Sequence, residues 1–331
     1  MKELLNHLFA HNTLSKEQAK TILKEIGEGK HSPMQIASFL TVFCMRSITV
    51  EELSGFREAM LEMLIPVDLS AYNAIDIVGT GGDGKDTFNI STTSSFVVAG
   101  AGYKVAKHGN YGVSSSVGSS NVLEYLGIEF TNDGKKLQAS IEKSGFCMMH
   151  AQLFHPAMKY AAPVRKEMQV RTFFNMLGPM INPSFPKQQL LGVYSLELQR
   201  LYGYLYQSTD TNYTIIHALD GYDEVSLTCP AKVIYNKGEA MLEPKNFGFK
   251  QVTQQALWGG ANVEESAKIL INILKGEGTE AQTTTVLANA ALAIKTIEQN
   301  WSLLDCVAKA KESIDSGKAF ASLNALVNIN S

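Results

Sequence analysis

A parallel α/β fold is encoded most clearly in Ala74-Ile75-Asp76-Ile77-Val78-Gly79-Thr80-Gly81-Gly82-Asp83. The short apolar run predicts a strand, and the glycines after it predict a tight loop. Residues 94–102 have mostly small side chains, and we expect them to form a helix. Residues 103–106 are expected to form a second strand. A strand, a loop, a helix and a strand in this order make the crossover unit of a parallel sheet.

Further elements of both kinds follow along the chain. Residues 189–193 and 213–218 predict strands, and residues 264–275 and 284–298 predict helices. We therefore expect an α/β fold with a mostly parallel central sheet flanked by helices.

The first 66 residues have a different character and predict helices only. Ser15 with Gln18 fits a capping box, as does Thr49 with Glu52, and Ser32 precedes a proline at a helix start. Residues 156–183 also predict helix. We expect residues 1–66 and roughly 156–183 to form a small all-helical domain, and residues 70–155 and 184–331 to form the α/β domain.

Composition narrows the class of protein. The chain has 331 residues and a formal net charge of -3, which argues against a broad basic surface for nucleic acid. Its four cysteines are scattered without CxxC spacing, as in proteins of a reducing compartment. No segment reaches the roughly 18 apolar residues of a membrane span. We expect a cytoplasmic protein with no nucleic-acid or membrane partner.

The loop after the first strand has the properties of a phosphate site. Glycine amides can approach a ligand closely, and Asn89, Ser91 and Thr92 come where the next helix is expected. A dinucleotide fingerprint requires the helix to open at Gly84, but residues 86–89 intervene. A Walker A loop requires Ser or Thr where Asp86 stands. Neither motif is supported.

Two more polar clusters follow strands of the same sheet. Lys107-His108-Gly109-Asn110 begins a loop rich in serine and glycine, and Asp223-Glu224 comes after residues 213–218. The carboxyl ends of parallel strands open on one edge. Adjacent carboxylates together with substrate phosphates suit Mg²⁺. The three clusters therefore predict a magnesium-dependent phosphate site.

Together these segments resemble the anthranilate phosphoribosyltransferase family of tryptophan biosynthesis. The resemblance covers nearly the whole chain, in order. The matching segments are GTGGD (79–83), NIST (89–92), KHGN with its serine tail (107–119), HPAMK (155–159), PVR (163–165), RTFFNMLGPMINP (171–183) and the pair Asp223-Glu224. The resemblance implies transfer of phosphoribosyl from phosphoribosyl pyrophosphate to the amino group of anthranilate. It also implies Mg²⁺ and a homodimer formed through the helical domain.

Site residues are implied by the same resemblance. Ser91, Asp223 and Glu224 would hold Mg²⁺, and Gly79, Asn110 and Arg165 would hold anthranilate. Lys107, His108, Asn110 and Arg165 form the implied catalytic set. The residues implied for the phosphoribosyl donor are Gly79, Gly82, Asp83, Thr87, Asn89, Ile90, Ser91, Thr92, Lys107, His108, Gly109, Asn110, Tyr111, Gly112, Val113, Ser114, Ser115 and Ser119.

The chain departs from the family pattern in one loop, and two other functions stay open. The family often has Arg, Ala, a basic residue and Ser where Tyr111, Gly112, Ser116 and Val117 stand, so positive charge is lost here. A pyrimidine nucleoside phosphorylase shares the architecture, although its lysine signature begins differently. A nucleic-acid-binding relative without transferase activity is the other alternative.

Overall fold

The structure, a computed structural model, describes residues 1–112 and 117–330. Val113, Ser114 and Ser115, which the resemblance assigns to the donor, lie outside the described residues. The chain divides into two compact units. The helical unit comprises Met1–Pro66 and Ala151–Pro183, and the α/β unit comprises Val67–His150 and Ser184–Ser331.

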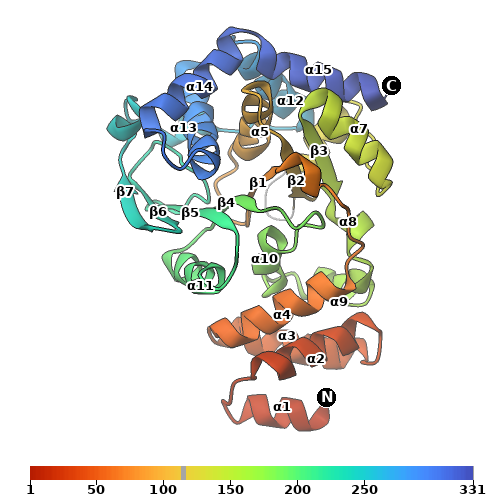
Figure 1. The fold of residues 1–331 in the computed structure, drawn as a ribbon. Coiled ribbons are helices and arrows are strands. Elements are labelled where there is room, and N and C mark those ends of the chain that lie inside the picture. The colour runs from red at the N-terminus through yellow and green to blue at the C-terminus, as the bar shows by residue number, and fades with distance from the viewer. Residues whose placement is uncertain (113–116, 331) are drawn as a thin grey trace. The chain divides into compact units, whose positions relative to one another are not determined.

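The α/β unit is built on a seven-stranded sheet in the order β3-β2-β1-β4-β5-β6-β7 (Figure 1). The pairings from β3 to β5 are parallel, whereas β6 and β7 pair antiparallel. The expected fold class is thus confirmed, and the antiparallel edge is an addition. The strands are β1 (Ile75–Gly79), β2 (Val105–Gly109), β3 (Phe146–His150), β4 (Gln188–Gly192), β5 (Asn212–Ala218), β6 (Ala231–Tyr235) and β7 (Gly238–Leu242).

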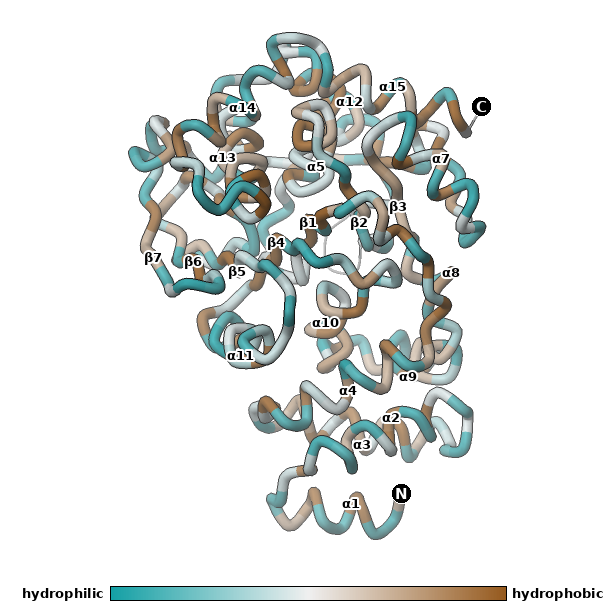
Figure 2. The backbone as a smooth tube through the Cα atoms, in the orientation of Figure 1, coloured by the Kyte–Doolittle hydropathy of each residue, from teal (hydrophilic) through white to brown (hydrophobic). Residues whose placement is uncertain are grey.

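Helices cover this sheet. The long helix α13 is buried along most of its length and packs against α5 and α14. Figure 2 shows hydrophobic segments in β1 and α13, whereas α7 alternates between polar and hydrophobic residues. The elements are η1 (Ser70–Tyr72), α5 (Ile90–Gly100), α6 (Ser119–Tyr125), α7 (Gly134–Ser144), α11 (Leu196–Tyr206), η4 (Pro244–Phe247), η5 (Gln254–Leu257), α12 (Val263–Leu274), α13 (Glu280–Ile297), α14 (Leu303–Asp315) and α15 (Lys318–Asn330).

The helical unit has its own aromatic core. Phe39, Phe43 and Phe56 pack against Phe173, which joins its two chain segments. The elements are α1 (Lys2–Phe9), α2 (Lys16–Gly27), α3 (Pro33–Met45), α4 (Val50–Met63), α8 (Ala151–Phe154), η2 (Pro156–Lys159), α9 (Ala161–Met168), α10 (Phe174–Leu177) and η3 (Gly178–Met180). The capping boxes expected at Ser15 and Thr49 are confirmed by hydrogen bonds in both directions.

Two expected boundaries are wrong, and both bear on the site. The strand expected at 103–106 is β2 (Val105–Gly109), so Lys107 and His108 lie within the strand and are buried. A lysine is tolerated there because its amine donates to the Ile77 carbonyl of the neighbouring strand. The helix expected from residue 94 is α5 and begins at Ile90, which places Ser91 in its first turn.

No helix in the described part of the chain combines the length and the apolar character needed to cross a bilayer.

Candidate functional site

The loop after β1 turns repeatedly through left-handed backbone. Gly81, Gly82 and Gly84 have positive φ angles, and so does Asp86, at 49°. Glycine adopts this conformation at no steric cost, and it exposes successive N–H groups on one concave side. The glycine loop, residues 79–89, therefore has the backbone of an anion-binding loop.

Asp223 reaches this loop across the end of β4. Its Oδ2 accepts a hydrogen bond from the Gly81 N–H at 2.7 Å. A Cβ on Gly192 would lie 1.6 Å from the Asp223 carbonyl oxygen, and a Cβ on Gly79 would lie 2.3 Å from Asp223 Oδ2. Only glycine at these two strand ends lets the Asp223 segment pass so closely.

Ser91 joins all three polar clusters. Its N–H, in the first turn of α5, donates to Glu224 Oε1 at 2.8 Å. Its Oγ accepts from Lys107 Nζ at 3.4 Å. The glycine loop, Lys107 and the Asp223-Glu224 pair are thus brought together at one edge of the sheet.

The charges at this edge are crowded and buried. Burial, reinforced by Asp83, raises the pKa of Asp223 to about 7. Burial and the adjacent Asp223 raise the pKa of Glu224 well above its usual range. Burial lowers the pKa of Lys107, and the surrounding carboxylates oppose that shift. A cation bound beside the carboxylates would relieve their repulsion.

The carboxylates and the hydroxyl at this edge fit a Mg²⁺ ion that also binds substrate and water. They fit less well a metal ion whose ligands all come from the protein. Among the described residues, no group of three or more His, Cys, Asp or Glu side chains is arranged to hold a metal ion. Mg²⁺ in phosphate-transfer sites takes one or two carboxylates and fills its other positions with water and substrate oxygens. Asp223 and Glu224 with the Ser91 hydroxyl fit that requirement.

Several buried polar atoms at the same edge have no protein partner. Thr80 Oγ1, Asn89 Oδ1 and Thr92 Oγ1 make no hydrogen bond within the described part of the chain. Buried polar groups are nearly always satisfied, so such atoms mark a place for a ligand or ordered water. Two hydroxyls and an amide beside glycine amides suit a phosphate or a ribose.

The described parts of the loop after β2, residues 110–112 and Gly118, are held by side chains of α6. Asn110 O accepts from Ser119 Oγ at 3.3 Å, and the Gly112 N–H donates to Asn121 Oδ1 at 3.0 Å. The Tyr111 hydroxyl donates to Glu124 at 3.1 Å. At the start of the loop, the His108 N–H donates to buried Asp76. Thr87, on the glycine loop, forms an isolated bridge with Trp258.

Arg165 belongs to the helical unit, on α9. Its guanidinium donates to Asn175 Oδ1 at 3.3 Å and lies 5.1 Å from the centre of the Phe174 ring. Burial lowers its pKa. It makes no ion pair with any described residue. A half-buried guanidinium without a carboxylate is prepared to bind one from a ligand.

Two supporting residues were not predicted from sequence. Thr80 follows β1 directly, and Asn289 on α13 bonds both the N–H and the carbonyl of Val225, next to Glu224. An amide in the apolar run of residues 286–294 was a usable signal, since a buried Asn needs specific partners.

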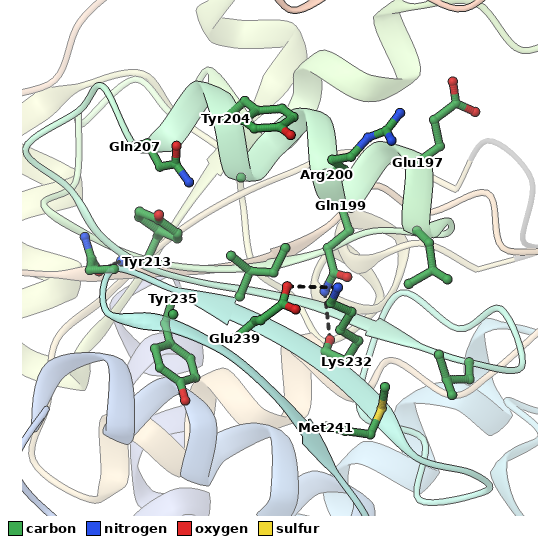
Figure 3. A pocket seen from close by; sticks show the side chains of 16 residues that line it. Glu197, Gln199, Arg200, Tyr204, Gln207, Tyr213, Lys232, Tyr235, Glu239 and Met241 are labelled. Carbon is green, nitrogen blue, oxygen red and sulfur yellow. Dashed lines mark hydrogen bonds and ion pairs between the residues drawn. The ribbon is translucent and has the colours of Figure 1, made fainter.

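A groove of about 840 Å³ between α11 and β6–β7 contains no predicted site residue (Figure 3).

Known proteins match this chain along its whole length. A family described as "Glycosyl transferase family, a/b domain" matches residues 71–320, and its "helical bundle domain" matches residues 2–63. The chain is 60% identical over 330 residues to the anthranilate phosphoribosyltransferase of Christiangramia forsetii, covering 100% of this chain and 99% of that protein.

Solved structures agree. The crystal structure of anthranilate phosphoribosyltransferase from Thermus thermophilus is similar with a TM-score of 0.92 and 34% identity, over 98% of each chain. The Saccharomyces cerevisiae protein in complex with PRPP and Mg is similar with a TM-score of 0.91 and 27% identity, over 98% of this chain and 96% of that one. Neither a nucleoside phosphorylase nor a nucleic-acid-binding function gains support from these relatives.

Proposed function

This chain belongs to the anthranilate phosphoribosyltransferase family, and we propose that it transfers the 5-phosphoribosyl group of phosphoribosyl pyrophosphate (PRPP) to the amino group of anthranilate. The products are N-(5-phosphoribosyl)anthranilate and pyrophosphate, in L-tryptophan biosynthesis. The observation that carries the proposal is a set of three hydrogen bonds: Asp223 accepts from Gly81 of the glycine loop, and Ser91 bonds to both Glu224 and Lys107.

The donor-binding role falls to the loops after β1 and β2. Neutral hydrogen-bonding groups come from the Thr92 hydroxyl, the Asn89 amide oxygen and the backbone amides of the glycine loop, and Lys107 supplies positive charge. Of the residues assigned to the donor, those described are Gly79, Gly82, Asp83, Thr87, Asn89, Ile90, Ser91, Thr92, Lys107, His108, Gly109, Asn110, Tyr111, Gly112 and Ser119.

Mg²⁺ would be held by Asp223, Glu224 and the Ser91 hydroxyl. When bound there, it supplies positive charge that stabilises the departing pyrophosphate. The yeast relative is known in complex with PRPP and Mg, which supports this assignment. The raised pKa values of the carboxylates also favour a cation between them and the donor.

The chemistry requires charge stabilisation rather than a protein nucleophile. The bond between ribose C1 and the pyrophosphate oxygen breaks, and the amino nitrogen bonds to C1 through an oxocarbenium-like transition state. The nitrogen then releases one proton to water, and pyrophosphate leaves with the electron pair of the broken bond. Lys107 neutralises charge on the leaving group. An aromatic amine is unprotonated at neutral pH, so a strong base is not needed and His108 is assigned to orienting the loop. Its backbone N–H donates to the Asp76 carboxylate.

Anthranilate is assigned to Arg165, Asn110 and Gly79. The guanidinium of Arg165 has no carboxylate partner among the described residues, and a bidentate pair with the anthranilate carboxylate would satisfy it. Holding the acceptor at a fixed orientation lowers the entropic part of the barrier.

A homodimer through the helical unit also belongs to this proposal. Met34 and Met45 on α3 are 81% and 83% exposed, and Phe9 on α1 is 58% exposed. Met34 and Met45 are three helical turns apart and so lie on one side of α3. Met45→Glu should shift the mass measured by light scattering from dimer to monomer, while Leu304→Glu, at an exposed apolar site on α14, should not.

The activity is tested by the fluorescence of anthranilate. It should fall with time when the protein, PRPP and Mg²⁺ are mixed, and it should stay constant when PRPP or Mg²⁺ is omitted. Constant fluorescence in the complete mixture would refute the proposal. Release of a base from uridine or thymidine with inorganic phosphate would identify the phosphorylase instead.

A further inference from the structure

Lys85 is the one cationic residue of the glycine loop, residues 79–89, and the assignments above give it no role. Its side chain crosses the turn that leads to the carboxylate pair. The Nζ lies 4.7 Å from the centre of the Tyr222 ring, and a Cβ on Gly221 would lie 3.5 Å from Lys85 Cε. The Lys85 ammonium therefore lies against the residue that immediately precedes Asp223.

The backbone of the glycine loop also fixes the position of Lys85. The Lys85 N–H donates to Asp83 Oδ1 at 3.1 Å, and the left-handed residues Gly84 and Asp86 flank it. Burial raises the pKa of Asp83, and the positive charge of Lys85 opposes that shift. Lys85 thus shares the electrostatic environment of the candidate donor site.

The ammonium group of Lys85 keeps its donors available. Within the described part of the chain, its Nζ makes no ion pair or hydrogen bond, and the side chain is half-buried. A contact between an ammonium group and an aromatic ring contributes about 0.5–2 kcal/mol, depending on how far the pair is removed from water. An anionic ligand can compete for this group at little cost.

The candidate donor site has more carboxylates than cations among its protein side chains. Asp83, Asp223 and Glu224 lie there, and Lys107 is buried with its amine on Ile77 and Ser91. Residues 107–121 contain no lysine or arginine besides Lys107. With Lys107 alone, three carboxylates stand against one protein cation, and a contribution from Lys85 would reduce that negative excess for a donor that carries several phosphate charges.

We propose that Lys85 binds a phosphate group of PRPP and so adds a cation to the donor site, an inference that rests on the proposed function. The cation acts by contact with the donor, not by holding the fold. It should therefore affect affinity for the donor more than turnover or affinity for the acceptor.

The test compares steady-state kinetics of the full chain with Lys85→Met, Lys85→Gln and Lys85→Arg. Lys136→Met is the control, because Lys136 is an exposed lysine on α7 of the same unit. We expect the PRPP KM to rise about tenfold in the Met and Gln variants, as for loss of one charged hydrogen bond. The anthranilate KM and kcat should change less than about twofold, and Arg should restore most of the affinity.

Inhibition by two fragments of the donor identifies the phosphate. A higher inhibition constant for pyrophosphate in Lys85→Met would assign the contact to the diphosphate, and a higher inhibition constant for ribose 5-phosphate would assign it to the 5-phosphate. An unchanged PRPP KM with active wild type overturns the inference, as does a fall in kcat at constant PRPP KM, which would mean that Lys85 only orders the loop. Inactive wild type would instead refute the proposed function.

Discussion

The two units of this protein prepare for their ligands by different means. In the α/β unit, the site is interlocked: Gly81 bonds to Asp223, Ser91 bonds to both Glu224 and Lys107, and two glycines admit the Asp223 segment. In the helical unit, one guanidinium is held by one amide and one ring. Changes in the interlocked site should therefore alter stability, metal binding and donor binding together, whereas changes at Arg165 should alter acceptor binding alone.

The largest effect is expected at the tightest contact of the interlocked site. Gly192→Ala would put a Cβ 1.6 Å from the Asp223 carbonyl oxygen, so β4 or the Asp223 segment must move. We expect a loss of more than about 3 kcal/mol in the free energy of unfolding, by the cost of overpacking, and no measurable activity. Urea denaturation measures the free energy of unfolding, and the anthranilate fluorescence assay measures the activity.

Gly203→Ala is the matched control, because its Cβ would lie at an ordinary 3.6 Å from Ile234 in the middle of α11. It should stabilise the protein by about 0.5–1 kcal/mol through helix propensity. A Gly192→Ala protein as stable and active as the wild type would show that the site is not interlocked.

At Asp223 we expect a substitution to lower activity but to raise stability. Asp223→Asn should lower kcat/KM at least roughly a hundredfold and remove the dependence on Mg²⁺, because several kcal/mol of charge stabilisation is lost.

The same variant should be more stable than the wild type without metal. The folded pKa of about 7 exceeds the value near 3.9 of an unfolded chain, so the carboxylate costs stability as pH rises from 4 to 7. We expect a gain on the order of 1–3 kcal/mol at pH 8 with a chelator and little gain at pH 4. A loss of stability at pH 8 would contradict the crowding of charges described here.

A smaller and more selective effect is expected in the helical unit. Arg165→Gln should raise the anthranilate KM about a hundredfold, as for loss of a bidentate charged pair, and change the PRPP KM less than about twofold. Lys166→Gln, the next residue on α9 and exposed, is the control. Equal changes in both KM values would remove the distinction between the two units.

The last effect concerns the pH dependence of stability in the helical unit. Burial lowers the pKa of His155, in the helical unit, to about 4. An unfolded histidine titrates near 6.5, so the unfolded state binds more protons between these values and stability falls as pH drops from 6.5 to 4. His155→Gln should flatten this fall by about 2–3 kcal/mol in urea titrations. Parallel curves for the two proteins would exclude His155 as the cause.

Local chemistry made parts of both units predictable. The glycine run after residues 74–78 required a strand and a loop, and the pairs Ser15–Gln18 and Thr49–Glu52 form the expected capping boxes. The strand β3, with its cysteine and methionines, has no β-branched residue and was not predicted. The antiparallel strands β6 and β7 were missed as well.

Tertiary contacts explain what the sequence could not indicate at the site. Lys107 looked like a loop residue, but it is buried in β2 because Ile77 and Ser91 accept from its amine. Gly192 carries no motif, and its importance depends on a segment more than thirty positions further along the chain. The bond between Asn289 and Val225 likewise joins residues distant in sequence.

Calorimetric titration of PRPP in the presence of Mg²⁺, without anthranilate, tests most directly whether the three clusters form one donor site. The proteins are the wild type, Lys107→Met, Glu224→Gln and the double variant. Because both residues bond to Ser91, we predict one PRPP per chain, weaker binding in each single variant, and a coupling energy between them of about 0.5–3 kcal/mol. Strictly additive losses, or binding that neither substitution weakens, would contradict a shared site.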